Sequence, residues 1–142
     1  MSENLFLDEQ HPISRRFAVL EDDGNSAWLY LTEPDSERPC ADAWVYNRIA
    51  PPSREAVASF RPSPPPAAAG FACDTALCAS PEKHEWAFAW SADGESVAVT
   101  KDGRPVACII AGKKRGYSQE LAEDGPWGHV WSDSVFAEAF GR

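Results

Sequence analysis

Residues 85–90 constrain the fold more than any other part of the sequence. They alternate strictly, with three aromatic side chains on one face and Glu or Ala on the other, which is typical of a strand with one buried face. A turn at 91–95 and a β-branched stretch at 96–100 follow. Asp102-Gly103, which tolerates the positive φ of a tight hairpin, then leads into 105–111. We therefore expect a three-stranded antiparallel meander whose aromatic face lies in the core.

The N-terminal part repeats this organisation. Residues 16–20 and 27–31 read as strands joined by a turn at 21–25, and alternation of Trp44 and Tyr46 with small residues predicts a further strand at 41–47. About six strands in two meanders predict a mainly β fold, in which an antiparallel meander sheet closes into a small sandwich or barrel. The pattern leaves the choice between the two closures open.

A proline-rich segment separates the two meanders. Seven of the 12 prolines lie between Pro51 and Pro81, and proline removes the N–H donors that a sheet needs. We therefore interpret residues 51–83 as a long loop or insertion, with a short helical turn capped by Ser53. The length of 142 residues fits one domain, 1–142.

The C-terminus has the signature of a short helix. Ser132 or Asp133 is a suitable N-cap. The residues that follow place an apolar stripe on one helical face, made of Val135, Phe136, Ala139 and Phe140.

The charge balance narrows the range of partners. The chain carries 22 acidic and 13 basic residues, a net charge of −9, which argues against nucleic acid because phosphate binding depends on clustered positive charge. Ten of the acids but only three bases lie in residues 1–42. Within them, Glu21, Asp22 and Asp23 precede Gly24 and read as an exposed hairpin turn. These three are candidate binding residues for a basic protein partner.

The location is predicted from what the sequence lacks. It contains no apolar stretch of about 18 residues, so we expect no membrane contact, and the acidic N-terminus does not resemble a secretion signal. We therefore expect a cytoplasmic protein whose four cysteines are free thiols. The spacing of Cys73, Cys78 and His84 does not match a structural zinc pattern, and the sequence indicates neither a metal site nor a cofactor.

No catalytic constellation is evident, since no serine lies in a nucleophile elbow. His129 is the most informative of the three histidines, because Trp127, Trp131, Ser132 and Asp133 flank it. Two interpretations remain open. Either His129 holds a loop through one hydrogen bond, or Tyr117, His129, Trp131 and Asp133 line a binding or catalytic pocket.

The order of five short motifs resembles that of a family of small bacterial proteins of unknown function. The matching segments are Phe17 to Gly24, Trp28 to Tyr30, Trp90 to Gly94, Gly116-Tyr117 and His129-Val130-Trp131. This resemblance implies a single domain and no particular activity. Acidic composition without a catalytic signature is in addition similar to immunity proteins of toxin–antitoxin and interbacterial competition systems.

Three functions follow as expectations. The leading one is a non-enzymatic cytoplasmic binding protein, of the immunity or antitoxin type, that neutralises a basic partner protein. The second is a small-molecule-binding or enzymatic β-barrel with its site around His129. The third is a structural homodimer that uses a sheet edge or an aromatic face.

Overall fold

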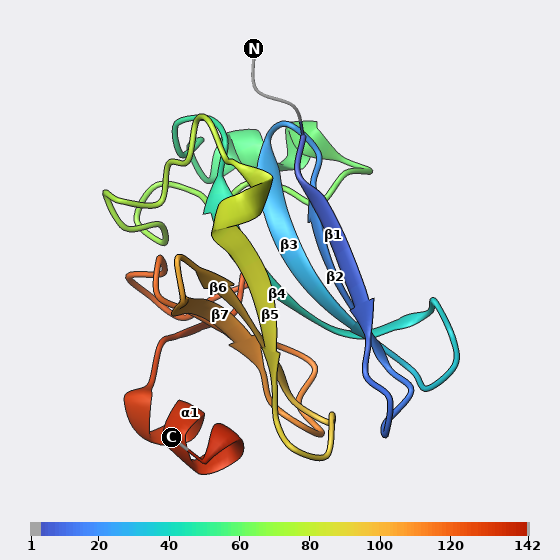
Figure 1. Cartoon of the computed structure of the whole chain (residues 1–142). Helices are drawn as coiled ribbons and strands as arrows, with labels where there is room; N and C mark the ends of the chain where they lie inside the picture. The colour runs from blue at the N-terminus through green and yellow to red at the C-terminus, as the bar shows by residue number, and fades with distance from the viewer. Residues whose placement is uncertain (1–3, 142) are drawn as a thin grey trace.

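Residues 4–141, the part that the computed structural model describes, form two β-sheets that pack face to face (Figure 1). The first sheet is antiparallel, in the order β1 (Phe6–Gln10), β2 (Phe17–Asp22), β3 (Ser26–Thr32) and β4 (Pro39–Asn47). The second has the order β5 (Trp86–Trp90), β6 (Val97–Lys101), β7 (Arg104–Ile109), β8 (Tyr117–Ser118) and β9 (His129–Val130). Only β8 and β9 are parallel neighbours in it. The predicted mainly β class is confirmed. Within the described residues the sheets do not close into a barrel, and their arrangement is that of a sandwich.

The core lies between the inner faces of the two sheets. Leu20 and Leu29 of the first sheet and Val97, Val99 and Ile109 of the second are fully buried there. Each of these strands alternates between inward and outward residues, because successive side chains of a strand point to opposite faces. The alternation predicted from the sequence therefore arises because one face of each strand packs in the core and the other points away from it.

The aromatic face of β5 is only partly core. Trp86 is 5% exposed, whereas Phe88 and Trp90 are half-buried against the core. The difference arises because β5 is the edge strand of its sheet. Trp90 closes that edge by donating its indole Nε1–H to Glu9 Oε1 of β1, 2.7 Å away.

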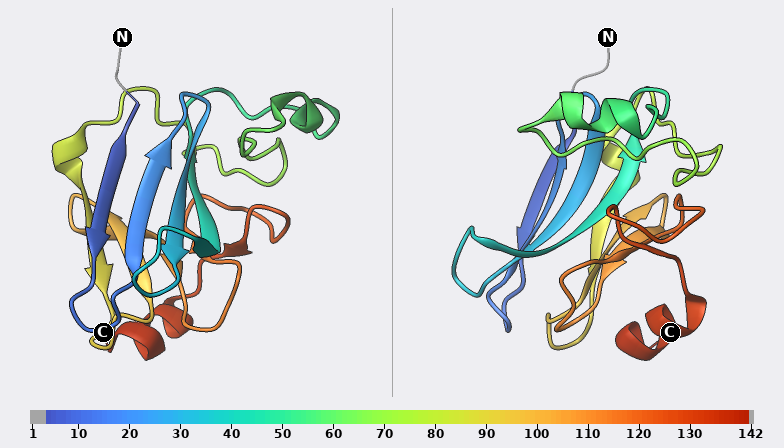
Figure 2. Two further views of the ribbon diagram at one scale, coloured as in Figure 1. Left: turned by 90° about the vertical axis from the view of Figure 1, so that its right-hand side faces the viewer. Right: turned by 180° about the vertical axis from the view of Figure 1, so that it is seen from behind.

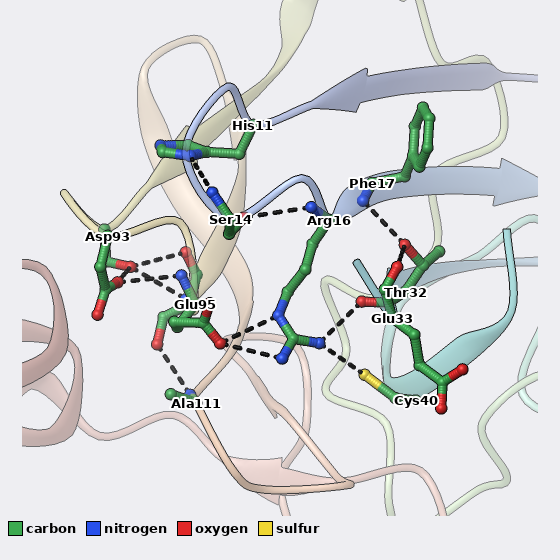
Figure 3. A network of polar contacts seen from close by, with 12 residues as sticks. His11, Ser14, Arg16, Phe17, Thr32, Glu33, Cys40, Asp93, Glu95 and Ala111 are labelled. Atoms are coloured by element: carbon green, nitrogen blue, oxygen red, sulfur yellow. Dashed lines mark hydrogen bonds and ion pairs between the residues drawn. The ribbon is translucent and has the colours of Figure 1, made fainter. Parts of the chain in front are cut away.

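A polar network fastens the lower ends of the two sheets to each other (Figure 3). Arg16 donates from Nε and Nη2 to Glu95 Oε1, both at 3.0 Å, and from Nη1 to the Thr32 carbonyl at 3.0 Å. Gly94 has a φ of +73°, and a Cβ there would come within 2.3 Å of the His11 ring. The turn after β5 thus needs glycine both for its backbone conformation and for the close approach of the other sheet.

The proline-rich segment folds back onto the outer face of β3 and β4. It contains the 3₁₀ helix η1 (Glu55–Phe60), and a second 3₁₀ helix, η2 (Lys83–Glu85), leads into β5. Asn47 holds the segment in place: its side chain is fully buried, accepts from Ala67 N at 2.9 Å and donates to Ala67 O at 2.9 Å. Trp28 and Trp44 are buried against the alanines of this segment.

The C-terminal helix α1 (Asp133–Phe140) packs on the outer side of the second sheet. Its predicted N-cap is confirmed, since the Ser132 hydroxyl accepts from Val135 N at 3.3 Å. Phe136 is the buried residue of the predicted stripe and lies against Ala98 and Cys108. Among residues 4–141, no helix has the length and apolar character needed to cross a membrane.

Three strands lie outside the predicted set, namely β1, β8 and β9. The last two have two residues each, too few to produce a detectable alternation. Strand β1 has only two inward apolar residues, Leu5 just before it and Leu7 within it, and then becomes polar. Its pattern is therefore too short to separate from a loop by period alone.

Candidate functional site

The outer face of the first sheet is the candidate functional site. Across three strands it carries side chains that we call the acidic aromatic face: Phe6, Asp8, Phe17, Val19, Glu21 and Tyr30. The register places Phe6 opposite Glu21, and Val19 lies between Asp8 and Tyr30. Because these positions point away from the core on adjoining strands, they form one continuous surface.

This surface is open over β1 and β2. In the left view of Figure 2 these strands face the viewer with no other strand or helix in front of them. Phe6 is 49% exposed, Asp8 and Glu21 are exposed, and Phe17, Val19 and Tyr30 are half-buried. Single exposed apolar side chains are ordinary, but a row of them across adjacent strands is typical of an interaction surface.

The acidic residues of this face are free of ion pairs. Arg15 and Arg16, two of the three bases in residues 1–42, pair with Asp35 and Glu95 at 3.0 Å. Within residues 4–141, no basic group lies within 4.0 Å of a carboxylate of Asp8, Glu21 or Asp23. The negative charge of the face is therefore uncompensated.

The pKa of the Tyr30 hydroxyl reflects the negative charge of this face. Burial, and then Glu21, Asp42 and Asp23 in decreasing order, raise the pKa of its hydroxyl to about 12. Both causes act in the same direction, since an anionic tyrosinate is disfavoured by poor hydration and by nearby carboxylates.

We expect the ionisation of Tyr30 to be measurable at 295 nm as the difference between the wild type and Tyr30→Phe. The difference should appear near pH 12 rather than near pH 10. Because the pKa of Tyr30 is higher in the folded than in the unfolded state, the protonated hydroxyl favours folding below the unfolded pKa. This contribution to the free energy of unfolding is lost as the pH rises toward 12. Glu21→Gln should move the titration to lower pH. A Tyr30 signal centred near pH 10 in the folded protein would contradict the assignment.

Asp22 corrects one expectation: it does not lie in an exposed turn. It is the last residue of β2, opposite Ala27, and its side chain is fully buried on the inner face. Tyr46 Oη and Arg48 Nη1 donate to its Oδ2 at 2.7 and 2.8 Å, and Gly24 N donates to Oδ1 at 2.7 Å. Charged residues enter such positions only when paired. Of the three acidic candidates, only Glu21 and Asp23 face solvent.

The four candidates Tyr117, His129, Trp131 and Asp133 form two pairs of residues in contact. The rings of Tyr117 and His129 have centroids 5.1 Å apart. Trp131 instead donates from Nε1 to Asp133 Oδ1 at 2.8 Å and packs on Phe136 of helix α1. These contacts bring Tyr117 to His129 and Trp131 to Asp133.

His129 lies beside a carboxylate that sequence reasoning did not include. Its Nδ1 is 3.6 Å from Asp124 Oδ2, and the His129 side chain is 45% exposed. The Val130 N–H, and secondarily His129, hold the pKa of Asp124 below its usual range. Asp124 Oδ1 accepts that N–H at 2.7 Å, so the carboxylate stabilises the loop before β9.

Of the residues on this face, sequence reasoning identified only Glu21 as a candidate; it missed Phe6, Asp8, Phe17, Val19 and Tyr30. Phe6 and Asp8 can be assigned to this face only once β1 is recognised as a strand. Tyr30 lies within the strand predicted at 27–31, but only its pairing with Val19 shows that it shares a face with Phe6 and Asp8. The sequence feature that could have revealed β1 is the alternation of Leu5 and Leu7 with Phe6 and Asp8.

No protein-family model, curated protein or solved structure matches this chain. Within the described residues, no group of three or more His, Cys, Asp or Glu side chains is arranged to hold a metal ion.

Proposed function

We propose that this protein binds a basic partner protein through its acidic aromatic face and neutralises it, in the manner of an immunity or antitoxin protein. The observation that carries the proposal is the open row of Phe6, Phe17, Val19 and Tyr30, flanked by the unpaired carboxylates of Asp8 and Glu21. Aromatic side chains are enriched at the centres of protein interfaces, where a few residues supply most of the binding energy, and charges at the rim speed and orient association.

The cytoplasm is the proposed location. All four cysteines are free thiols, the state that a reducing compartment maintains. Cys108 is 1% exposed and acts as a small core residue, and burial raises the pKa of its thiol to about 12. A thiol with that pKa stays protonated and unreactive, in keeping with a structural role.

The test is capture of a partner by matched charge-reversal variants. Tagged wild type, Asp8→Lys/Glu21→Lys and Glu123→Lys/Glu138→Lys are expressed in the organism that encodes the chain. The last two variants change the net charge equally, and Glu123 and Glu138 are exposed on other elements. We expect wild type and the Glu123/Glu138 variant to retain a basic protein in fixed stoichiometry, and the Asp8/Glu21 variant to lose it, because like charges then oppose each other across the interface.

The co-purified protein is then expressed alone in a second bacterium. Growth inhibition that wild type relieves and Asp8→Lys/Glu21→Lys does not would support neutralisation. Equal capture by both charge-reversal variants would contradict the proposed face. So would an ultracentrifugation profile in which wild type is a dimer and Asp8→Lys/Glu21→Lys a monomer, since that result assigns the face to a homodimer.

A further inference from the structure

A hollow of about 730 Å³ lies beside the acidic aromatic face, where three distant parts of the chain converge. Strands β3 and β4 form its floor, the proline-rich segment forms one wall, and the loops around residues 115 and 127 form the other. In the left view of Figure 2 the proline-rich segment and the loops between β7 and β9 extend beyond the β4 edge on the same side. We call this hollow the arginine pocket. Its volume falls in the range of small-molecule sites.

The pocket gathers positive charge in an acidic protein. Arg54 and Arg61 from the proline-rich segment and Arg115 from the loop after β7 all line it, and Asp42 is its single carboxylate. Within residues 4–141 no carboxylate lies within 4.0 Å of the guanidinium of Arg54 or Arg61. Within that range, neither guanidinium therefore has an acidic partner. That of Arg54 lies over the Phe71 ring, 4.7 Å from its centroid, a contact that leaves the N–H groups at its edge available to an anion.

The walls between these charges are flat and apolar. Trp28 and Trp127 line the pocket with Tyr30 and three prolines. Both indole N–H groups are already used, since Trp28 Nε1 donates to Ser26 Oγ at 3.3 Å and Trp127 Nε1 to the Pro65 carbonyl at 3.1 Å. Trp28 and Trp127 are only 6% and 5% exposed, so each ring presents a small apolar area to the hollow, to which the half-buried Tyr30 adds its own.

One acceptor in the pocket has no partner. Asp42 Oδ1 lies 4.0 Å from Arg115 Nη1 and receives no hydrogen bond. Arg115 directs an Nη1–H to the Pro126 carbonyl instead. Burial raises the pKa of Asp42, an effect that Arg115 only partly opposes. This oxygen is buried from solvent, so in this conformation it is not an acceptor that a ligand in the hollow can reach.

We propose that the arginine pocket binds a small aromatic anion, in which a carboxylate or phosphate meets Arg54 and Arg61 and the ring packs against the apolar lining to which Trp28, Tyr30 and Trp127 contribute. The guanidinium fork matches carboxylate and phosphate geometry alike. This inference goes beyond protein binding and does not depend on it. Tyr30 belongs to both surfaces, but the arginines that would hold the anion lie outside the acidic aromatic face.

The test titrates the protein with the fluorescent aromatic anion 8-anilinonaphthalene-1-sulfonate. Wild type should bind it saturably at one site, and Arg54→Gln/Arg61→Gln should bind it about tenfold more weakly or worse, as expected when charge-assisted hydrogen bonds are lost. Arg38→Gln/Arg104→Gln is the matched control, since both residues are exposed and lie outside the pocket. Its affinity should equal that of wild type.

Competition then defines the ligand class. Benzoate and phenyl phosphate should displace the dye while neutral benzyl alcohol at the same concentration should not, and the stronger of the two anions identifies the preferred group. In wild type, the same anions should shift the indole N–H resonances of Trp28 and Trp127, a readout that does not require a variant to fold. Absent or non-saturable dye binding, equal weakening in both arginine variants, or equal displacement by benzyl alcohol would overturn the proposal.

Discussion

Asp22→Ala is expected to lower the free energy of unfolding by about 3–5 kcal/mol, the usual cost of removing one partner of a buried ion pair. The Asp22 side chain is fully buried and Arg48 is 9% exposed. Removing the carboxylate leaves the guanidinium, the Tyr46 hydroxyl and the Gly24 N–H without their acceptor. Arg48 Nε already lacks a partner within the described residues, so the guanidinium has little to replace the lost contact.

Urea unfolding followed by tryptophan fluorescence measures this change. The neighbouring Glu21→Ala is the control, because Glu21 is exposed on the opposite face of the same strand, and surface substitutions usually change stability by less than about 0.5 kcal/mol. The double variant Asp22→Ala/Arg48→Ala should be less destabilised than the sum of the single variants. A loss below about 1 kcal/mol for Asp22→Ala, or strict additivity, would show that the pair does not act as a buried unit.

Asn47→Ala is expected to release the proline-rich segment from the sheet. Three buried groups lose their partner: the Ala67 N–H, the Ala67 carbonyl and the Trp44 indole N–H, which donates to Asn47 Oδ1 at 3.0 Å. Each buried group left unsatisfied costs about 1–3 kcal/mol, so the loss should be on the order of 3 kcal/mol. The alanines that cover Trp28 and Trp44 should then separate from the sheet.

Limited trypsin digestion distinguishes this local release from general instability. Cleavage after Arg54, in the proline-rich segment, should accelerate in Asn47→Ala well before the two sheets are cut. Asn25→Ala is the control, since the Asn25 side chain makes no hydrogen bond within the described residues. Equal cleavage rates in the two variants would contradict the role assigned to Asn47.

The mainly β class was predictable because it depends on alternation and turn chemistry, both of which are local. Asp102 and Gly103 adopt φ values of +50° and +82°, as expected for a tight Asp-Gly hairpin. The Ser132 cap was predictable for the same reason, because a cap needs only its own first helical turn.

The candidate site was less predictable because it depends on contacts between distant residues. Asp22 reads as part of an acidic turn, and only the positions of Tyr46 and Arg48, more than twenty residues away, show that its carboxylate is buried. Likewise, no local pattern indicates that Arg54 and Arg115 line one hollow. Spacing along the chain does not reveal such neighbours.

The division of the chain between the two sheets also has a kinetic consequence. Strands β1–β4 come entirely from residues 6–47 and β5–β9 from residues 86–130, as the separation of blue from yellow and red in Figure 1 makes visible. Strand pairing therefore closes short loops only, at low entropic cost. The one long loop to be closed is the proline-rich segment, when the two halves dock on each other. The Arg16–Glu95 ion pair and the Glu9–Trp90 hydrogen bond then join the two sheets. We therefore expect the two halves to assemble locally first and to join in a later, slower step, because the contacts between them span the largest separations along the chain.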